Sequence, residues 1–334
     1  MQKAVRYLET DSVDPFFNLA FEEYLLQNKK DGDYLILWQN DNTIVIGQNQ
    51  NAEAEINRSF VEQHNIKVAR RTTGGGAVYH DLGNLNYSFI TDAGELSTLT
   101  MNRFTDAVVN ALGSLGLKAE ASGRNDILVN GRKVSGTAQR ITGDRILYHG
   151  TLLFDSDADM VSGALNVDPA KFVSKSSKSV KSRIGNIRSM LDRDMTLEQF
   201  WDRIKHELSG GGFSRYSLTA DELDKVNQLV QDKYSRWEWN FGRSPRYELT
   251  NKQRFTGGTL EISAKVEGGL ITDIVFYGDF MAVTSVEPLV NALKSTPFRR
   301  ADVEKVLSRF PISDMFGSVT KDEILNTVFY AGDC

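Results

Sequence analysis

Apolar residues recur along the chain in two kinds of pattern, one typical of strands and one of helices. Short β-branched or alternating segments predict strands at 5–8, 34–38, 43–46, 68–71, 77–79, 85–90, 126–129, 134–141 and 146–154. Helical spacing of apolar residues predicts helices at 15–27, 55–64, 104–115, 158–165, 197–208 and 220–234. Clusters of strands with helices between them are typical of an α+β fold, with a mostly antiparallel or mixed sheet and flanking helices.

Turn residues at three places predict hairpins. Gln-Asn-Asp-Asn separates 34–38 from 43–46, whereas Asn130-Gly131 and Gly143-Asp144 separate the last three strands. Turn residues of these types join neighbouring antiparallel strands. We therefore expect a hairpin over 34–46 and three consecutive antiparallel strands between 126 and 154.

A second set of elements begins at about Arg254. Two alternating segments, 259–266 and 270–277, flank a glycine-containing turn and predict another hairpin. Helices are expected after it at 286–293, 300–307 and 321–328. The segment before this set, 237–245, holds two of the four Trp and ends in Gly and Pro. We place a boundary after it, with a large domain at 1–244 and a small α+β domain at 250–334.

Composition and charge exclude several classes of protein. The 334 residues are 40% apolar and 25% charged with 6 Pro, as in an ordinary globular protein, which excludes collagen-like, disordered and coiled-coil chains. A net charge of -5 argues against nucleic acid as the main partner. No segment resembles a signal peptide or reaches the ~18 consecutive apolar residues of a membrane-spanning helix. We expect a cytoplasmic protein that binds neither nucleic acid nor membrane.

The sequence contains one cysteine, and it is the last residue, Cys334. One cysteine allows no intramolecular disulfide, no cysteine-based zinc cluster and no Cys-x-x-Cys redox pair. A terminal cysteine is also a poor catalytic nucleophile, because chain ends fray while a nucleophile needs a fixed partner base. We therefore expect chemistry that does not use an enzyme thiol.

The segment from Arg70 to Asp81, RRTTGGGAVYHD, is the strongest local candidate for a binding site. Three glycines between predicted strands allow a ligand to approach the backbone, and several N–H groups can converge on an anion. A bare Gly-Gly-Gly can equally be a flexible turn, as we expect for Gly210 to Gly212, which has no basic neighbours. The two arginines before the first run and His80-Asp81 after it favour anion binding there.

A second candidate is the segment from Gly123 to Arg140, GRNDILVNGRKVSGTAQR. As a hairpin, it places Asn125 and Asp126 near the start of one strand and Lys133 near the start of the next. Val134, Gly136 and Ala138, at alternate positions after Lys133, leave one face with little bulk, so a lysine on that face can reach an anion as a point charge. A solvated turn lysine is the alternative. Because the P-loop and Gly-x-Gly-x-x-Gly motifs are absent, a bound nucleotide requires another scaffold.

These two segments together resemble the signature motifs of lipoate-protein ligases. Shorter matches support the resemblance: DPFFNLA at 14–20, HGTLL at 149–153, SVKSR at 179–183 and the segment 237–242. The resemblance extends over essentially the whole chain and is weakest beyond Arg254. It implies the class II synthetase or biotin/lipoate ligase type of α+β fold, whose mixed sheet has flanking helices, with a catalytic domain at 1–244 and an accessory domain at 250–334.

The resemblance implies an ATP-dependent reaction in two steps. A lipoate carboxylate attacks the α-phosphate of ATP to give lipoyl-AMP and pyrophosphate, and a lysine ε-amine of a lipoyl domain then attacks the activated carbonyl. Both reactants of the first step are anionic, so Arg70, Arg71, Lys133 and Mg²⁺ are the expected stabilisers of charge.

The resemblance also implies roles for particular residues. The backbone from Gly74 to Tyr79 lines the adenylate and the lipoyl tail, and Lys133, the expected catalytic residue, contacts both the acyl carbonyl and the phosphate. Asp126 is a candidate magnesium or ribose contact, and His80 is expected to fix the loop rather than act as a base. The expected substrate-binding set is Arg70, Arg71, Thr73, Gly74, Gly75, Gly76, Ala77, Val78, Tyr79, His80, Asn125, Asp126, Lys133, Ser135, Gly136, Ala138, His149, Gly150 and Thr151.

A run of basic residues without intervening acids, Lys171, Lys175, Lys178, Lys181 and Arg183, is either a solvated loop or a surface for an acidic acceptor. In the family, the corresponding region is expected to close over the adenylate. The expected acceptors are lipoyl-domain proteins, namely the E2 subunits of 2-oxoacid dehydrogenases and the H protein of glycine cleavage. We expect the protein to act as a monomer.

Three alternatives remain within this resemblance. Acyltransferases of the same fold carry octanoyl or lipoyl groups on a cysteine thiolate, and a chain without cysteine before residue 334 disfavours that route. Biotin-protein ligase is a second alternative, against which the Arg-Arg-x-x-Gly-Gly-Gly-Ala-Val pattern argues. A catalytically inactive lipoate-binding paralogue is the third, and retention of both motifs with Lys133 argues against it.

Overall fold

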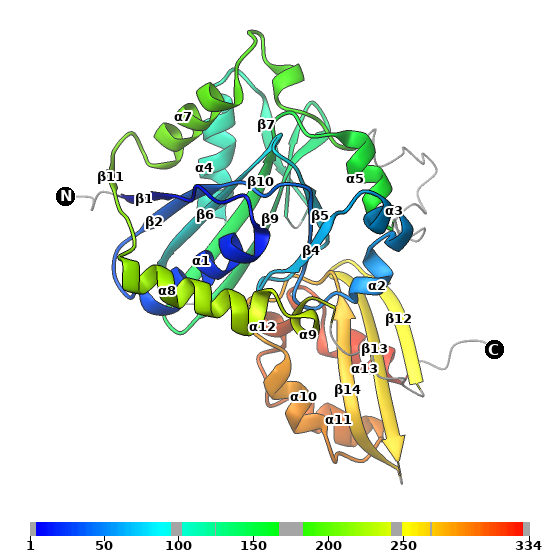
Figure 1. The fold of residues 1–334 in the computed structure, drawn as a ribbon. Helices are drawn as coiled ribbons and strands as arrows, with labels where there is room; N and C mark the ends of the chain where they lie inside the picture. Colours follow the sequence, from blue (N-terminus) through cyan, green and yellow to red (C-terminus); the bar gives the residue numbers. More distant parts are fainter. Residues whose placement is uncertain are drawn as a thin grey trace.

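The computed structural model describes residues 5–94, 102–123, 125–166, 183–241, 249–267 and 269–329. Its largest element is an eight-stranded sheet of mixed direction (Figure 1). In spatial order the strands are β11 (Phe213–Arg215), β1 (Val5–Glu9), β2 (Tyr34–Trp38), β6 (Asn84–Asp92), β10 (Arg145–Leu153), β9 (Arg132–Thr142), β8 (Asp126–Val129) and β7 (Ala119–Ser122). The α+β fold with a mixed sheet is therefore confirmed, as are the antiparallel pairs formed by β8, β9 and β10.

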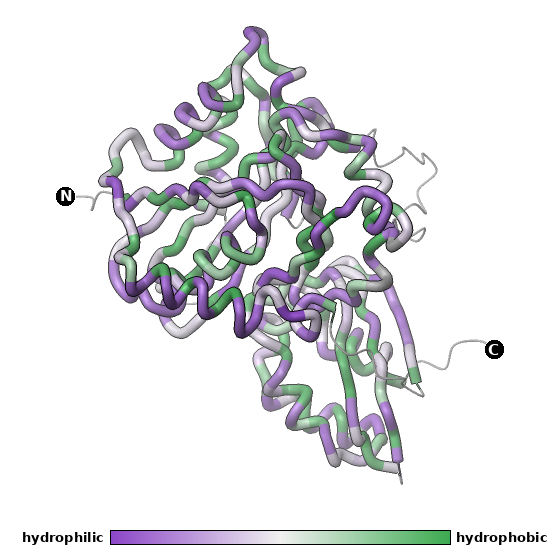
Figure 2. Tube along the Cα trace, in the orientation of Figure 1, coloured by the Kyte–Doolittle hydropathy of each residue, from purple (hydrophilic) through white to green (hydrophobic). Residues whose placement is uncertain are grey.

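Helices cover both faces of this sheet, so its central strands are apolar on both sides. Leu35 and Leu37 of β2 pack with α4 (Asn102–Gly113) and α7 (Leu197–Leu208), while Tyr34 and Ile36 pack with α1 (Pro15–Asn28) and α8 (Ala220–Leu229). Figure 2 shows hydrophobic and hydrophilic residues mixed along α8, as an amphipathic helix on a sheet requires. Helix α8 continues into the π-helical turn η4 (Val230–Tyr234).

The helix predicted after Asp14-Pro15 forms as α1. Asp14 caps it by accepting a hydrogen bond from the backbone N–H of Phe16 at 2.9 Å, and Pro15 occupies the first turn, where its missing N–H has no partner to lose. Most of this helix is buried, including Glu22 and Glu23.

The hairpin predicted over 34–46 is wrong. Strand β2 pairs with β1 and β6, so both of its edges are already occupied. The next strand, β3 (Thr43–Ile46), leaves the large sheet and forms a second, three-stranded sheet between β4 (Lys67–Arg70) and β5 (Val78–His80). A polar link predicts a change of direction, but it does not determine which strand becomes the neighbour.

The helix predicted over 55–64 is divided into α2 (Ala52–Glu55) and α3 (Arg58–Gln63). Asn57 separates them and caps α3 by accepting a hydrogen bond from the N–H of Phe60. With α5 (Ala158–Ala164), these helices bury the second sheet. The short helices η3 (Arg188–Met190) and α9 (Trp237–Asn240) complete this part of the chain.

The C-terminal residues form a three-stranded antiparallel sheet with its own apolar core. Its strands are β12 (Leu249–Phe255), β13 (Gly258–Glu267) and β14 (Leu270–Gly278), and its helices are α10 (Glu287–Leu293), α11 (Arg300–Leu307), α12 (Ile312–Phe316) and α13 (Lys321–Val328). The predicted hairpin is confirmed as β13 and β14. Strand β12 was not predicted, because it has a polar sequence whose exposed positions include Lys252 and Arg254.

Backbone hydrogen bonds join this small unit to the large one. The N–H of Gly278 donates to the carbonyl of Asn49 at 2.8 Å, and the N–H of Ile141 donates to the carbonyl of Val283 at 2.8 Å. The segment after β14 thereby lies against the glycine-rich segment and β9. In the part of the chain that the structure describes, no helix has the length and apolar character needed to cross a membrane.

Candidate active site

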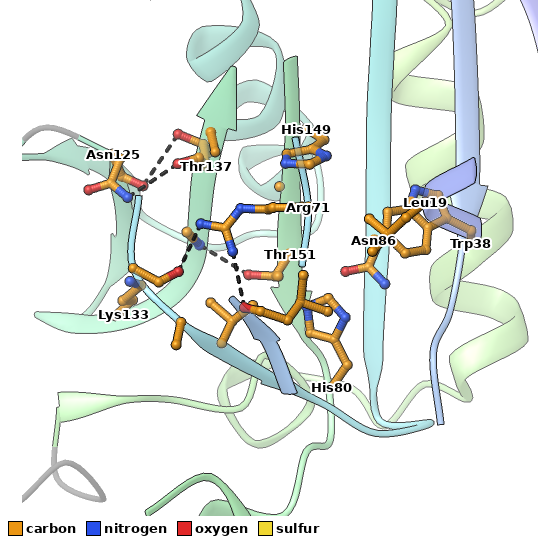
Figure 3. Close-up of a pocket in the computed structure, with 17 residues that line it drawn as sticks. Leu19, Trp38, Arg71, His80, Asn86, Asn125, Lys133, Thr137, His149 and Thr151 are labelled. Atoms are coloured by element: carbon orange, nitrogen blue, oxygen red, sulfur yellow. Dashed lines mark hydrogen bonds between the residues drawn. The ribbon is translucent and has the colours of Figure 1, made fainter. Parts of the chain in front are cut away.

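Two adjoining cavities lie between the glycine-rich segment, β9 and β10. The narrow cavity, about 80 Å³, has apolar lining residues in Leu19, Trp38 and Val45. Figure 3 shows Leu19 and Trp38 side by side next to Asn86. The wide cavity, about 530 Å³, is more polar and extends to Arg183, Arg254 and Asp279. The residues that border both cavities are Gly76, Ala77, Val78, Asn125, Lys133 and Thr151.

The three consecutive glycines have different surroundings. A Cβ on Gly74 would lie 2.8 Å from the carbonyl oxygen of Phe280, in the small C-terminal unit, so this glycine allows the two units to approach. Gly75 has φ +85°, which favours glycine, and a side chain on Gly47 would overlap its carbonyl oxygen. Gly76 has open space where a Cβ would be, and of the three it alone lines the cavities.

Arg70 uses its guanidinium group to hold backbone segments together. It donates to the carbonyl oxygens of Gly47 at 2.9 Å, Gln50 at 2.6 Å and Asn240 at 2.9 Å. Burial lowers the pKa of Arg70 to about 10, so it stays charged at neutral pH. Its backbone N–H donates to the side chain of Asn240, which fastens α9 to β4.

Arg71 fixes the glycine-rich segment in the same way, from the wall of the narrow cavity. Its Nη2 donates to the carbonyls of Gly74 at 2.6 Å and Gly76 at 2.8 Å, and its Nη1 to that of Val45 at 3.1 Å. Burial lowers the pKa of Arg71 to about 10. Direct contact of either arginine with a bound anion stays a prediction, whereas these bonds give both side chains a structural role in positioning the loop.

Lys133 lies where the two cavities meet. Its Nζ forms an ion pair with Asp126 at 2.7 Å, and the absence of a side chain on Gly136 leaves room for it. A β-bulge places Leu128 opposite Lys133 and Ile127 opposite Ser135, so β9 has one extra residue.

This bulge corrects the expected arrangement of β9. The alternation in sequence places Val134 with Gly136 and Ala138 on the strand face that was expected to meet the ligand. In the structure, Val134 is instead buried in the core. The extra residue instead brings Lys133 to the cavity that Gly136 and Ala138 border. The bulge was not predicted, because the alternation of residues in the sequence does not show where one strand has a residue without a partner on the neighbouring strand.

His149 belongs to a buried polar network behind the narrow cavity. Its Nδ1 lies 3.0 Å from Oε1 of Glu22, and its Nε2 lies 2.9 Å from Oγ1 of Thr73. Glu22 also accepts a hydrogen bond from Ser88, which in turn accepts one from the indole N–H of Trp38 at 2.8 Å. The network therefore fixes the cavity wall at Trp38 and the start of the glycine-rich segment together.

His80 is buried in the wall of the narrow cavity. Its Nδ1 lies 3.1 Å from the amide nitrogen of Asn40, so Nδ1 is the acceptor and Nε2 carries the proton in the neutral ring. Burial, with the charge of Arg71, lowers the pKa of His80 to about 3. A histidine of such low pKa is neutral at pH 7 and a poor base, which supports the expected role of fixing the loop.

The structure brings most of the expected site residues to the two cavities. The narrow cavity is lined by Arg71, Gly76, Ala77, Val78, His80, Asn125, Lys133, Gly136, Ala138, His149, Gly150 and Thr151, and the wide one additionally by Tyr79 and Asp126. Arg70, Thr73, Gly74, Gly75 and Ser135 lie behind these walls. Lys171 to Lys181 of the basic run lie outside the described residues, and Arg183 lines the wide cavity.

Several site residues were missed by sequence reasoning. Trp38 and Val45 look like ordinary core positions in the sequence, and no motif contains them, while Leu19 lies in the DPFFNLA match but received no role there. Glu22 carried a weak signal, since it is one of two adjacent acidic residues within the apolar part of helix α1. Arg254 and Asp279 come from the small unit, and only the docking of that unit brings them to the wide cavity.

Comparisons with known proteins identify the class to which this fold and site belong. Residues 14–209 match the family model of the lipoyl protein ligase A/B catalytic domain, and residues 244–328 match that of the bacterial lipoate protein ligase C-terminus. Lipoate-protein ligase LplJ of Bacillus subtilis is 41% identical over 95% of this chain and 97% of its own length. Lipoate–protein ligase 1 of Staphylococcus aureus is 39% identical over 96% of this chain and 99% of its own length. The chain therefore belongs to the lipoate-protein ligase family, which confirms the resemblance seen in its motifs.

Solved structures are similar as well. P. falciparum LipL1 in complex with lipoate has a TM-score of 0.78 at 25% identity and covers 92% of this chain and 94% of that one. A lipoate-protein ligase A bound with ATP has a TM-score of 0.64 at 29% identity and covers 72% of this chain and 99% of that one. A bipartite lipoate protein ligase from Thermoplasma acidophilum, studied with its E2 lipoyl domain, has a TM-score of 0.65 at 31% identity and covers 75% of this chain and 100% of that one.

Proposed function

We propose that this protein is an ATP-dependent lipoate-protein ligase that activates lipoate as lipoyl-AMP and transfers the lipoyl group to a lysine of a lipoyl domain. The observation that carries the proposal is the meeting, at Lys133, of a narrow cavity that has apolar lining residues and a wide cavity of more polar lining. An apolar acyl chain fits the narrow cavity between Leu19, Trp38 and Val45, which leaves the carboxylate next to Lys133. The wide cavity then receives ATP.

In the first step, a carboxylate oxygen of lipoate forms a bond to the α-phosphorus, and the bond from that phosphorus to the pyrophosphate oxygen breaks. The Lys133 ammonium group stabilises the charge that the carboxylate and the phosphate bring together. Arg71 contributes by holding the backbone of the glycine-rich segment against the cavity. His80 stays neutral and therefore adds no positive charge to the cavity it lines.

In the second step, the neutral ε-amine of the acceptor lysine attacks the acyl carbonyl, and AMP leaves with the oxygen that came from lipoate. An adenylate route is favoured over a thioester route, because no cysteine lies before residue 334 to carry the acyl group.

Mg²⁺ would accompany ATP in the wide cavity. Among the described residues no group of three or more His, Cys, Asp or Glu could hold a metal alone, which fits a Mg²⁺ ion bound mainly by phosphates with one or two carboxylates. Asp126 lines the wide cavity next to Lys133, and it is the carboxylate that we propose for contact with this ion. When bound, the ion would neutralise phosphate charge.

The acceptors that we propose are the E2 subunits of 2-oxoacid dehydrogenases and the H protein of glycine cleavage. The T. acidophilum relative, which was studied with an E2 lipoyl domain, supports this class of partner. We further propose that the protein acts as a cytoplasmic monomer, with a catalytic domain at 1–244 and an accessory domain at 250–334. The basic run from Lys171 to Arg183 would attract an acidic acceptor.

The test is release of pyrophosphate with lipoate, octanoate or biotin, with and without a lipoyl-domain acceptor. We expect release with lipoate, and lipoylation only when the acceptor is present. Release with biotin alone would make the protein a biotin ligase, and no release with any acid would make it a binding protein without turnover. Lys133→Ala should reduce lipoate-dependent release by about tenfold or more, because a charged hydrogen bond contributes about 1.5–3 kcal/mol.

A further inference from the structure

The wide cavity receives an arginine from the small C-terminal unit. Arg254, near the end of β12, lines this cavity together with Lys133 and Asp126 of the large unit. It does not line the narrow cavity, whereas Lys133 lines both. Arg254 is therefore a cation on the polar side only, away from the apolar walls around Trp38.

Hydrogen bonds within the small unit hold Arg254 at the cavity wall. Arg254 lies opposite Thr259 in the pairing of β12 with β13, and its Nη1 donates to Oγ1 of Thr259 at 3.1 Å. The backbone N–H of Thr259 donates to the carboxylate of Asp279 at 2.6 Å. Asp279 is buried and lines the same cavity, so the arginine and its support form one structural group.

Contacts between the two units then bring this group to the cavity. Gly278, next to Asp279, donates to the carbonyl of Asn49 at 2.8 Å. Two residues further on, Phe280 lies against Gly74, where any side chain would collide with its carbonyl oxygen. The position of Arg254 thus depends on the docking of the small unit beside the glycine-rich segment.

The charges in the wide cavity indicate which part of ATP Arg254 contacts. The ammonium group of Lys133 is partly neutralised by Asp126, at 2.7 Å, while a nucleoside triphosphate brings about four negative charges to be balanced. A guanidinium group can bind two phosphate oxygens at once and is always charged. These properties suit it to the pyrophosphate part of ATP, which is the leaving group. The carboxylate and the α-phosphate react next to Lys133, so a cation confined to the wide cavity is placed for the β- and γ-phosphates.

We propose that Arg254 contacts the β- and γ-phosphates of ATP and stabilises the charge on pyrophosphate as it leaves. The electron pair of the broken bond between the α-phosphorus and the bridging oxygen moves to that oxygen, and Arg254 supplies positive charge there. This role rests on the proposed ligase function. Because pyrophosphate has left before the acceptor amine reacts, Arg254 serves activation and not transfer.

The experiment compares Arg254→Gln with Lys252→Gln in the full-length protein. Lys252 is exposed on the same strand two positions earlier and lines neither cavity, so it controls for the loss of one charge on β12. Pyrophosphate release is measured against ATP concentration with lipoate present. In a separate assay, synthetic lipoyl-AMP is supplied and lipoylation of a lipoyl domain is followed.

For Arg254→Gln we expect kcat/KM for ATP to fall by about 10- to 100-fold, as the loss of a charged hydrogen bond predicts, while transfer from lipoyl-AMP changes less than about twofold. Lys252→Gln should match the wild type in both assays. Equal loss in both half-reactions, unchanged activation, or the same loss in Lys252→Gln would overturn the role of Arg254. A wild-type protein that releases no pyrophosphate would instead overturn the ligase function itself, and the role of Arg254 with it.

Discussion

The carbonyl oxygen of Phe280 occupies the space beside Gly74 so closely that a Cβ on this glycine would lie 2.8 Å from it. The first glycine of the signature segment is therefore required by contact between the two units of the chain. Gly76, two residues later, faces open space and the cavities. One run of three identical residues thus serves both domain docking and ligand access.

Gly74→Ala should weaken the docking of the small unit, because the added methyl group collides with backbone atoms, which cannot rotate away. We expect a larger radius of gyration by small-angle scattering and faster proteolysis between the two units. Gly76→Ala is the matched control, since its methyl group meets no atom within 4 Å, and it should keep the compact shape. Identical scattering curves for the two variants would contradict this assignment of Gly74.

Arg71→Lys separates the two roles considered for Arg71. Lysine keeps the positive charge but cannot reach the carbonyls of Val45, Gly74 and Gly76 at once, as the guanidinium group does. We expect a loss of about 1–3 kcal/mol in the free energy of unfolding, because buried carbonyl groups lose their donors. Activation and transfer should both fall, since both need the same loop.

Urea denaturation and the two half-reaction assays measure these effects. Arg71→Lys with wild-type stability and activity would show that only the charge matters, as expected if Arg71 acts mainly by direct contact with an anion.

The buried His80 should make the protein less stable in acid. Its pKa in the folded state is about 3, lowered from 6.5, so between these values the unfolded chain binds a proton that the folded chain does not. The free energy of unfolding should therefore fall as the pH falls from about 6.5 toward 3, by up to about 1.4 kcal/mol per pH unit from this group.

In His80→Gln this contribution should disappear, because glutamine does not titrate. Unfolding by urea at a series of pH values from about 4 to about 7 measures how the free energy of unfolding changes with pH. The upper limit lies about half a unit above the ordinary pKa of histidine. The two proteins should differ in slope, with the variant less sensitive to acid. Parallel curves would mean that His80 binds its proton over the same pH range in the folded protein as in the unfolded chain, which would contradict the lowered pKa.

Much of the fold could be predicted from the sequence where local signals determine it. Asp14 and Pro15 mark the start of α1 because capping and the first-turn position are local, and the alternation on both sides of a glycine-containing turn defines β13 and β14. The pairing of β3 was not predictable, since it depends on β1 and β6 occupying both edges of β2.

The site could be predicted only in part, for the same reason. Lys133, His80 and Gly76, which the motifs singled out because their segments have an unusual composition, line one pocket of the structure. Arg254 was missed because its strand is polar and its position depends on contacts between distant parts of the chain. Val134 was assigned to the wrong face because a bulge reverses the alternation after Lys133.

The central claim is that a carboxylate oxygen of lipoate attacks the α-phosphate of ATP in the cavity beside Lys133. Lipoate labelled with ¹⁸O in its carboxylate tests this most directly, with the full-length protein, ATP, Mg²⁺ and a lipoyl-domain acceptor. After one turnover the products are analysed by mass spectrometry. We expect AMP that carries one ¹⁸O atom and pyrophosphate that carries none. ADP together with labelled inorganic phosphate, or unlabelled AMP beside a lipoylated acceptor, would contradict it.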